Sequence, residues 1–219
     1  MTTAIIGVGN LGGAVARRLV AGGEPVVLAA GDEAHSQALA DELGPLARAA
    51  SVEEAIAGAD VVVFAVWLDT TRTLIAQHHS LLADKVVVDP SNPVGWDEQG
   101  QTIRTLPEGQ SAASIVAPLL PVGAQYVKAF GTLGADALAS SGDRQPRAVL
   151  FYATDDHEAV ITIQRLIRAA GFEPLRSGGV AEAGRLEMPS GDLHQAALNG
   201  ALLDIDQARA AVAGERVET

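Results

Sequence analysis

The chain of 219 residues contains no cysteine, which excludes disulfide bridges, thiolate nucleophiles and metal centres built on sulfur. Aromatic residues make up only 4% of the chain, and no apolar run approaches the roughly 18 residues of a membrane-spanning helix. Basic residues number 15 against 27 acidic ones, and the resulting net charge of −12 disfavours nucleic acid and anionic membranes as partners. We therefore predict no nucleic-acid partner and no membrane partner.

What the chain does contain is typical of a folded protein. Hydrophobic residues make up 48% and charged residues 19%, which excludes a mainly disordered chain. The length predicts one large domain with a smaller appendage. The stretch from Met1 to Gly7 has no basic region before its short apolar run, so we expect no targeting segment and a cytoplasmic location.

Short β-branched runs alternate with helical patterns, which predicts a Rossmann-type, doubly wound α/β fold with a mostly parallel sheet. The expected strands are 3–7, 25–29, 60–66, 85–89, 126–130, 148–152 and 173–176. The expected helices are 11–21, 33–43, 68–83, 111–120, 156–170 and 193–212, with a short helix after the capping box formed by Ser51 and Glu54.

Two features interrupt this alternation. Residues 90–110 are rich in proline and glycine and predict a long loop, either functional or a disordered surface excursion. A boundary near Gly131 divides a dinucleotide-binding domain (1–131) from a small C-terminal α/β extension (132–219) for substrate binding or dimerisation. This extension ends in the predicted helix 193–212.

The N-terminal motif Gly7-Val8-Gly9-Asn10-Leu11-Gly12 fits the dinucleotide-binding fingerprint, since it follows a strand and opens a helix. Gly7 would allow the tight turn, Gly9 the approach of a pyrophosphate, and Gly12 the close packing of helix on strand. The first N–H groups of the helix would then face the phosphates. The alternative is a glycine-rich turn that only solves a packing problem.

The end of the second predicted strand usually selects the nucleotide. Twenty residues after Gly12 stands Asp32, whose carboxylate could bind a ribose 2′-hydroxyl or could instead cap the following helix. Ala30 and Gly31 before it offer no cation for a 2′-phosphate, and the nearest candidate is His35. These residues favour NAD, or weak discrimination between NAD and NADP.

At this point the chain resembles the NADPH:F-420 oxidoreductase family, the deazaflavin-dependent NADP reductases, and the related N-terminal domain of STEAP-type metalloreductases. The resemblance covers nearly the whole chain and rests on the segments 4–12, 63–67, 87–93, 111–116 and 127–133. Two positions depart from the family. Ala30-Gly31 replaces the usual Ser-Arg pair that grips the 2′-phosphate, and Gly131 replaces a frequent Asn.

The resemblance implies the remaining cofactor contacts. Ala65, Val66 and Trp67 would line the adenosine–ribose side of the groove. Asn92 would lie near the nicotinamide ribose, and Ala129 and Phe130 near the nicotinamide ring. Core packing is the alternative for Trp67 and Phe130, and a turn before Pro93 is the alternative for Asn92.

The sequence predicts no acid–base or nucleophile arrangement. His78 and His79 are adjacent within a predicted helix and therefore suit no metal, and His157 has the position of a solvated helix start. His194, in a turn entering the last predicted helix, is a weak candidate for a substrate-facing residue. Lys128, one of two lysines, is expected to extend from a strand end toward solvent rather than to be a buried proton donor.

We predict an NAD(P)H-dependent oxidoreductase that passes hydride to a deazaflavin such as F-420, a flavin or a small organic acceptor. The alternative is an inactive NAD(P)-binding sensor or scaffold. The wide, alanine-rich apolar stripe of the predicted helix 193–212 favours a homodimer across a two-fold axis. Packing of this helix on its own sheet is the competing interpretation.

Overall fold

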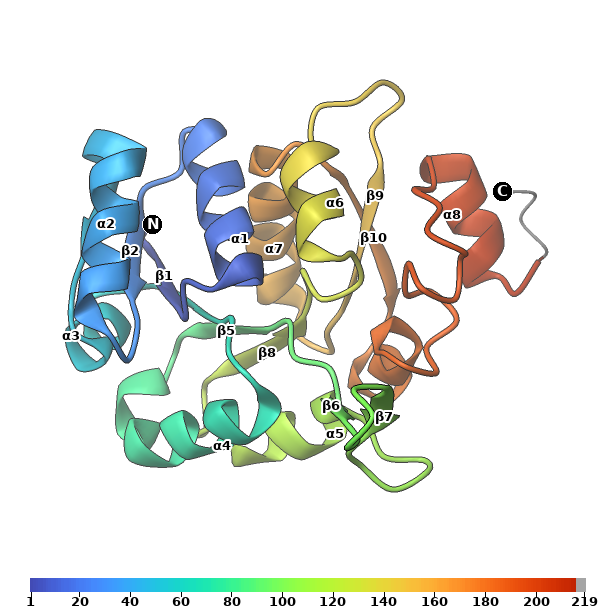
Figure 1. The fold of residues 1–219 in the computed structure, drawn as a ribbon, viewed down its shortest axis with the longest axis horizontal. Helices are drawn as coiled ribbons and strands as arrows, with labels where there is room; N and C mark the ends of the chain where they lie inside the picture. Colours follow the sequence, from blue (N-terminus) through green and yellow to red (C-terminus); the bar gives the residue numbers. More distant parts are fainter. Residues whose placement is uncertain (216–219) are drawn as a thin grey trace.

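A computed structural model describes residues 1–215 and contains one eight-stranded sheet in the order β10-β9-β8-β5-β4-β1-β2-β3 (Figure 1). All neighbouring strands are parallel except β8 and β9, which pair antiparallel. The predicted Rossmann-type sheet is therefore confirmed. The strands are β1 (Thr3–Ile6), β2 (Val26–Ala29), β3 (Ala47–Ala49), β4 (Val61–Phe64), β5 (Val86–Asp89), β8 (Gln125–Lys128), β9 (Val149–Ala153) and β10 (Glu173–Gly178).

The central strands β1, β4 and β5 are buried on both faces, as their continuous apolar sequences indicate. Ile5 of β1 is in register with Leu28 of β2 on one side and Val63 of β4 on the other. This register brings the ends of β1, β4 and β5 to one edge of the sheet, where ligands of this fold class bind.

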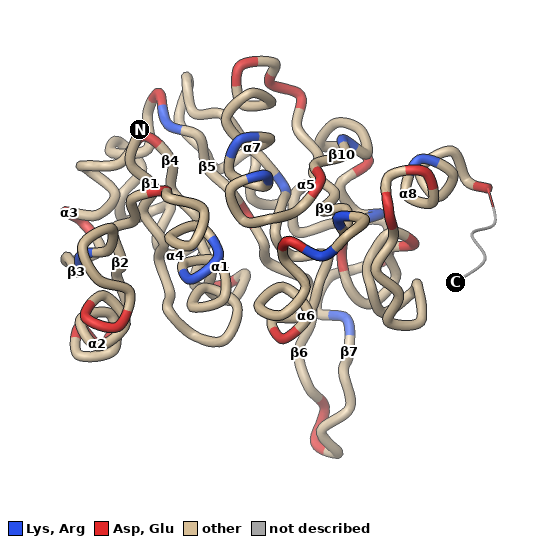
Figure 2. The backbone as a smooth tube through the Cα atoms, turned by 90° about the horizontal axis from the view of Figure 1, so that it is seen from above, with Lys and Arg blue, Asp and Glu red and all other residues tan. Residues whose placement is uncertain are grey.

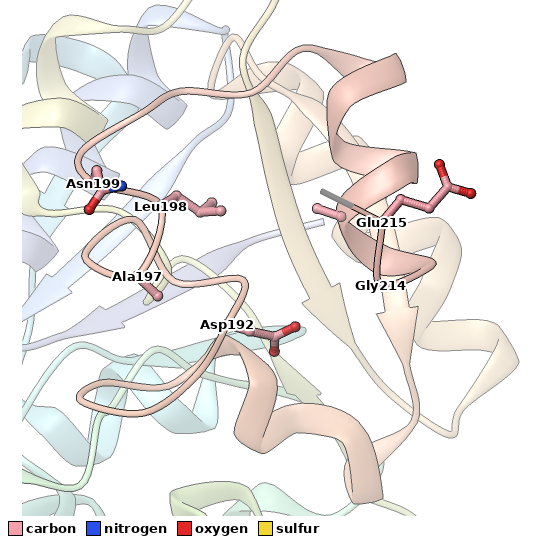
Figure 3. A pocket seen from close by; sticks show the side chains of 7 residues that line it. Asp192, Ala197, Leu198, Asn199, Gly214 and Glu215 are labelled. Carbon is pink, nitrogen blue, oxygen red and sulfur yellow. The ribbon is translucent and has the colours of Figure 1, made fainter. Parts of the chain in front are cut away.

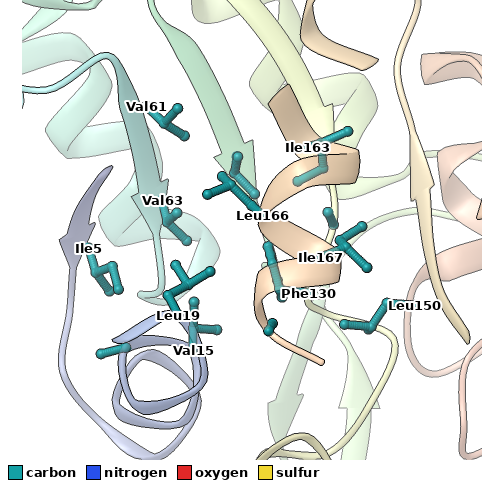
Figure 4. Packing of buried hydrophobic residues seen from close by; sticks show 14 of the residues in the cluster. Ile5, Val15, Leu19, Val61, Val63, Phe130, Leu150, Ile163, Leu166 and Ile167 are labelled. Carbon is teal, nitrogen blue, oxygen red and sulfur yellow. The ribbon is translucent and has the colours of Figure 1, made fainter. Parts of the chain in front are cut away.

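Helices cover both faces of the sheet (Figure 1). Figure 4 shows Val15 and Leu19 of α1 and Ile163 of α7 packed over the sheet. One face carries α1 (Asn10–Ala21), α2 (Glu33–Leu43), α6 (Ala135–Ser140) and α7 (His157–Ala169), and the other carries α3 (Val52–Ala57), α4 (Leu68–Gln77), α5 (Ala112–Val116) and α8 (Ile205–Val212). No helix within residues 1–215 has the length and hydropathy to cross a membrane.

The segment predicted as a loop over 90–110 contains a β-hairpin, with β6 (Val94–Trp96) paired antiparallel to β7 (Thr102–Arg104). Figure 2 shows this hairpin projecting from the body of the molecule with acidic residues at its tip. The Asp97 carboxylate accepts hydrogen bonds from the backbone N–H groups of Gln99 (3.0 Å) and Gln101 (2.8 Å), which fixes the turn. The excursion is therefore an ordered arm.

The predicted helix 193–212 was wrong over its first half, because only Ile205–Val212 is helical. Asn199 and Gly200 adopt positive φ angles of 52° and 83°, which interrupt a right-handed helix. The Gln195 N–H donates to the Thr132 carbonyl at 2.9 Å, so tertiary hydrogen bonds hold this segment in turns.

Two other predicted helices are shorter than expected. The helix predicted over 68–83 ends at Gln77, where His78 leaves the helical conformation, and a 3₁₀ turn follows. The helix predicted over 111–120 ends at Val116, since Pro118 lacks the N–H that would continue it. Sequence patterns also missed β3, α6 and the 3₁₀ helix Val180–Leu186.

The apolar stripe that favoured a helix-mediated dimer faces inward. Ala208 and Ala211 of α8 are buried, and Leu198 and Ile205 pack against the same hydrophobic cluster. The stripe therefore covers the chain's own sheet, which is the competing interpretation, and not an interface between two subunits. The homodimer itself stays a prediction. The domain boundary after Gly131 also stays one, and it falls between β8 and α6 in a sheet that continues into β9 and β10.

Candidate functional site

The surroundings of each glycine in the N-terminal turn explain in a different way why glycine occupies that position. Gly7 has a φ of +95°, and a Cβ there would lie 2.5 Å from the Ala65 carbonyl oxygen. A Cβ on Gly12 would lie 1.9 Å from the Gly7 carbonyl oxygen, so α1 can approach β1 only with glycine at this position. A Cβ on Gly9, by contrast, would meet no protein atom within 4 Å. Gly9 thus borders open space at the end of β1.

The start of α1 presents free donors to this space. Its N-cap residue Gly9 offers no side-chain cap, and no acidic residue occupies the first turn. Asn10 is exposed and Leu11 is half-buried. Uncapped N–H groups and the positive end of the helix dipole favour an anion here.

A groove of about 410 Å³ runs from this turn across the ends of β4 and β5. Its lining comes from three strand ends, from the hairpin and from the start of α6. The side chains are small, apolar, aromatic or neutral and polar. The lining residues are Gly9, Asn10, Leu11, Ala65, Val66, Trp67, Pro90, Ser91, Asn92, Trp96 and Ala135. The sequence placed seven of these in the cofactor site, and the structure brings all seven together.

Asn92 is fixed by two hydrogen bonds. Its side-chain nitrogen donates to the Gly131 carbonyl at 3.2 Å, and its side-chain oxygen accepts from the Met188 N–H at 2.8 Å. Asn92 therefore joins the end of β5 to the chain after β8 and to the C-terminal segment. These two hydrogen bonds give Asn92 a structural role beyond that of a turn residue before Pro93.

Two predicted contacts lie behind the groove rather than in its lining. Ala129 and Phe130 are 1% and 0% exposed, and both belong to the hydrophobic core. Phe130 adopts a positive φ of 63°, a conformation that a bulky residue rarely takes. For these two residues a contact with the nicotinamide ring stays a prediction.

The end of β2 carries the expected carboxylate. Asp32 accepts a hydrogen bond from the Ala34 N–H at 3.0 Å and caps α2, and His35 lies 3.8 Å from its other carboxylate oxygen. The side chain of Asp32 is 63% exposed, so the cap leaves it accessible. A Cβ on Gly31 would meet nothing within 4 Å. Ala30, Gly31 and Asp32 lie outside the groove lining and stay predicted contacts.

Comparisons with known proteins agree with this architecture. Residues 2–93 match the family described as NADP oxidoreductase, coenzyme F-420-dependent. A hypothetical protein of Sinorhizobium meliloti is 32% identical, and its crystal structure superposes with a TM-score of 0.80 over 93% of this chain and 95% of its own.

Over residues 2–93, the chain is therefore similar to the coenzyme F-420-dependent NADP oxidoreductase family.

Two curated relatives extend the comparison. The F-420-dependent NADP reductase of Methanothermobacter thermautotrophicus is 26% identical over 198 residues, which are 85% of each chain. The metalloreductase STEAP3 of Rattus norvegicus is 32% identical over 183 residues, or 84% of this chain. The present chain spans only about a third (35%) of that metalloreductase.

The chain holds a buried charge cluster beneath the groove. The Lys128 ammonium lies 3.2 Å from the Asp89 carboxylate and 3.1 Å from that of Glu187, and it donates to the Ser91 carbonyl. Lys128 is 1% exposed, which corrects the expected solvent-facing lysine. The Tyr126 hydroxyl donates to Asp89 at 2.7 Å, and burial, together with this carboxylate, holds the pKa of Tyr126 well above its usual value.

Glu187 connects this cluster to two other parts of the fold. Its carboxylate accepts the N–H groups of Ala112 (2.7 Å) and Ala113 (3.0 Å) at the start of α5. The next residue, Met188, is the donor to Asn92. The cluster therefore holds the C-terminal segment against the strand ends that form the groove. Sequence patterns missed Asp89 and Glu187, which are far apart in the chain.

His194 is buried and is not part of the groove lining. It is 6% exposed, and its Nδ1 accepts from the Ala196 N–H at 3.0 Å. Burial lowers the pKa of His194, and a hydrogen bond to the Gly131 backbone partly offsets this effect. The turn that holds His194 enters no helix, so its predicted setting was wrong, and its substrate-facing role stays a prediction.

The remaining predicted and detected features lie apart from the groove. His78 is the C-cap residue that follows α4 and His79 begins a 3₁₀ turn, whereas His157 begins α7 as expected. Residues 1–215 contain no cluster of His, Asp and Glu that could hold a metal. A second hollow, of about 240 Å³, lies beside α8. Figure 3 shows the acidic side chains of Asp192 and Glu215 among those that line it.

Proposed function

We propose that the chain binds a nicotinamide dinucleotide across the ends of β1, β4 and β5 and transfers hydride to a redox acceptor. One observation carries this proposal. The turn glycines Gly7 and Gly12 are required by protein contacts, whereas Gly9 leaves space on the groove side of an uncapped helix start. A pyrophosphate would fill that space and accept the N–H groups of α1.

The groove residues would act on the dinucleotide mainly by positioning it. Asn10 and Leu11 would hold the phosphates, and Ala65, Val66 and Trp67 the adjacent ribose. Asn92, fixed by the backbone of Gly131 and Met188, would support the nicotinamide end. The bound dinucleotide supplies the hydride, and the protein supplies orientation and exclusion of water.

The proposed acceptor is a deazaflavin such as F-420, a flavin or a small organic molecule. The neutral groove lining supports transfer between two redox carriers, because reduction of a carbonyl requires a proton donor beside the substrate oxygen. The similarity of residues 2–93 to an oxidoreductase family supports an enzyme rather than a sensor or scaffold.

The proposed cofactor is NADP or NAD. The family description favours NADP. The local chemistry favours NAD or weak discrimination, because Asp32 places an accessible carboxylate where a 2′-phosphate would lie and Gly31 offers no cation.

The proposal is tested by titrating the purified protein with NADPH and NADH, followed by turnover of each with F-420, FMN and small carbonyl compounds. We expect micromolar binding of at least one nucleotide and nucleotide oxidation with at least one acceptor. Absence of binding by either nucleotide to the folded protein would overturn the proposal. Binding without turnover by any acceptor would instead support the sensor or scaffold.

A further inference from the structure

Within residues 1–215, the only exposed aromatic side chains lie together at the groove. Trp67 and Trp96 are 57% and 59% exposed, and the two are the chain's only tryptophans. Every other aromatic side chain is at least nine-tenths buried, namely Phe64, Tyr126, Phe130, Phe151, Tyr152 and Phe172. Exposure of large apolar rings at one concave site is typical of a binding surface.

The two indoles come from different elements and contact each other. Trp67 is the N-cap residue of α4, and Trp96 is the last residue of β6 in the hairpin. Their ring centroids are 5.1 Å apart, with an interplanar angle of 79°. This edge-to-face arrangement still leaves more than half of each residue accessible, and both line the groove beside Asn92. The pair therefore presents aromatic surface to whatever occupies the groove.

The hairpin that carries Trp96 is held in place at its base. The guanidinium of Arg104 on β7 donates to the Leu106 carbonyl at 3.1 Å, to the Ser190 hydroxyl at 3.0 Å, and to the Gln110 carbonyl. These bonds tie the hairpin to its own following loop and to the C-terminal segment. Trp96 is therefore presented by an ordered arm.

A neutral hydroxyl lies in the same lining. Ser91 is 6% exposed, and its Oγ has no hydrogen-bond partner among the described residues. Buried hydroxyls normally have a partner. A ligand that combines a flat apolar ring with polar edge atoms would match both the indoles and this hydroxyl.

We propose that Trp96, whose indole Trp67 contacts edge-to-face, stacks on the ring system of the hydride acceptor and selects planar fused aromatic acceptors over small aliphatic ones. This inference rests on the proposed function and narrows its acceptor class. Stacking on an indole is sensitive to ring area and insensitive to ring substituents. Trp96 is thus a specificity-determining residue, whereas the turn around Gly9 would hold the phosphates.

The test compares Trp96→Ala, Trp96→Phe and the matched control Ile103→Ala. Ile103 lies on the same hairpin and is 43% exposed, but its cross-strand partner is Gly95, so its side chain lies on the opposite face from Trp96. FMN and F-420 are titrated into each protein with saturating nucleotide present, and the KM for each is measured in turnover. Nucleotide affinity is measured separately on every variant.

We expect Trp96→Ala to weaken FMN or F-420 binding at least about tenfold, as loss of one stacking contact does. Trp96→Phe should recover most of the affinity, and Ile103→Ala should match wild type in both acceptor and nucleotide affinity. Because both tryptophans lie at the groove, quenching of intrinsic fluorescence should accompany acceptor binding and should diminish in Trp96→Phe.

The inference is overturned, with the proposed function intact, if wild type binds nucleotide and Trp96→Ala changes the acceptor KM no more than Ile103→Ala does. It is equally overturned if neither planar acceptor binds and a small aliphatic carbonyl is reduced. Failure of wild type to bind any nucleotide overturns the proposed function and the inference together.

Discussion

Gly31→Arg tests the interpretation of the adenosine end of the groove. The substitution introduces the arginine that the NADPH:F-420 oxidoreductase family usually carries after β2. A Cβ at this position meets no atom within 4 Å, and the glycine does not adopt a positive φ. The side chain should therefore fit without strain, and the free energy of unfolding should stay within about 0.5 kcal/mol of wild type.

The expected gain follows from the charges nearby. A hydrogen bond to a charged partner contributes about 1.5–3 kcal/mol, and the Coulomb attraction at about 4 Å lies between roughly 1 kcal/mol in water and 4 kcal/mol near a protein surface. The exposed Asp32 carboxylate competes for the new guanidinium and reduces the gain. We expect NADPH affinity to rise about tenfold to a hundredfold, which is about 1.4–2.7 kcal/mol, with NADH affinity little changed.

Competitive titration of NADPH and NADH on wild type, Gly31→Arg and Gly31→Gln measures this effect. Gly31→Gln adds a long polar side chain without the charge and isolates the electrostatic contribution. The NADPH gain of the arginine variant should shrink as salt rises, because exposed charges are screened. A hundredfold preference of wild type for NADPH, or equal NADPH affinities in the two variants, would refute the reasoning.

The central sheet was predictable because a short, contiguous stretch of sequence identifies each of its strands. Strands such as Val61–Phe64 and Val86–Asp89 are continuous apolar runs, and the buried parallel sheet requires such runs. The glycine turn was predictable for the same reason, since Gly7 and Gly12 meet backbone atoms within their own strand–turn–helix unit and its neighbouring strand.

The C-terminal segment was not predictable, because long-range contacts determine it. Alanines and leucines over 193–204 have helical propensity, yet Gln195 bonds the backbone of Thr132 and Gly134. Tertiary hydrogen bonds of this kind outweigh propensities of a few tenths of a kcal/mol per residue.

The buried charge cluster was missed for a related reason. Asp89, Lys128 and Glu187 are separated by about 40 and 60 residues, and each alone has the appearance of a surface residue. Only the pairing of β5 with β8 and the return of the C-terminal segment bring them together. Trp96 escaped notice because its hairpin consists of two three-residue strands within a stretch rich in proline and glycine.

Three further predictions concern the turn, the charge cluster and the buried histidine. Gly9→Val should keep wild-type stability but lose at least about tenfold in nucleotide affinity, since its side chain enters the space of the phosphates. Gly12→Ala should instead lower the free energy of unfolding by about 1–3 kcal/mol, because its Cβ clashes with the Gly7 carbonyl in the turn. Equal nucleotide affinity in folded Gly9→Val and wild type would contradict the phosphate assignment. Lys128→Met leaves two buried carboxylates without their cation and should lower the free energy of unfolding in urea by about 3–5 kcal/mol. Lys85→Met, at the other lysine, is the control. If both variants lowered the free energy of unfolding by the same small amount, the cluster would contribute little to stability. For His194, burial depresses the pKa in the folded state, so protonation favours the unfolded chain. Its contribution to stability is therefore complete above the unfolded pKa of about 6.5 and is lost as pH falls toward the lower folded pKa. Thermal unfolding between pH 8 and pH 5 should show a smaller decrease in Tm for His194→Gln than for wild type, and parallel decreases would exclude this histidine as the cause.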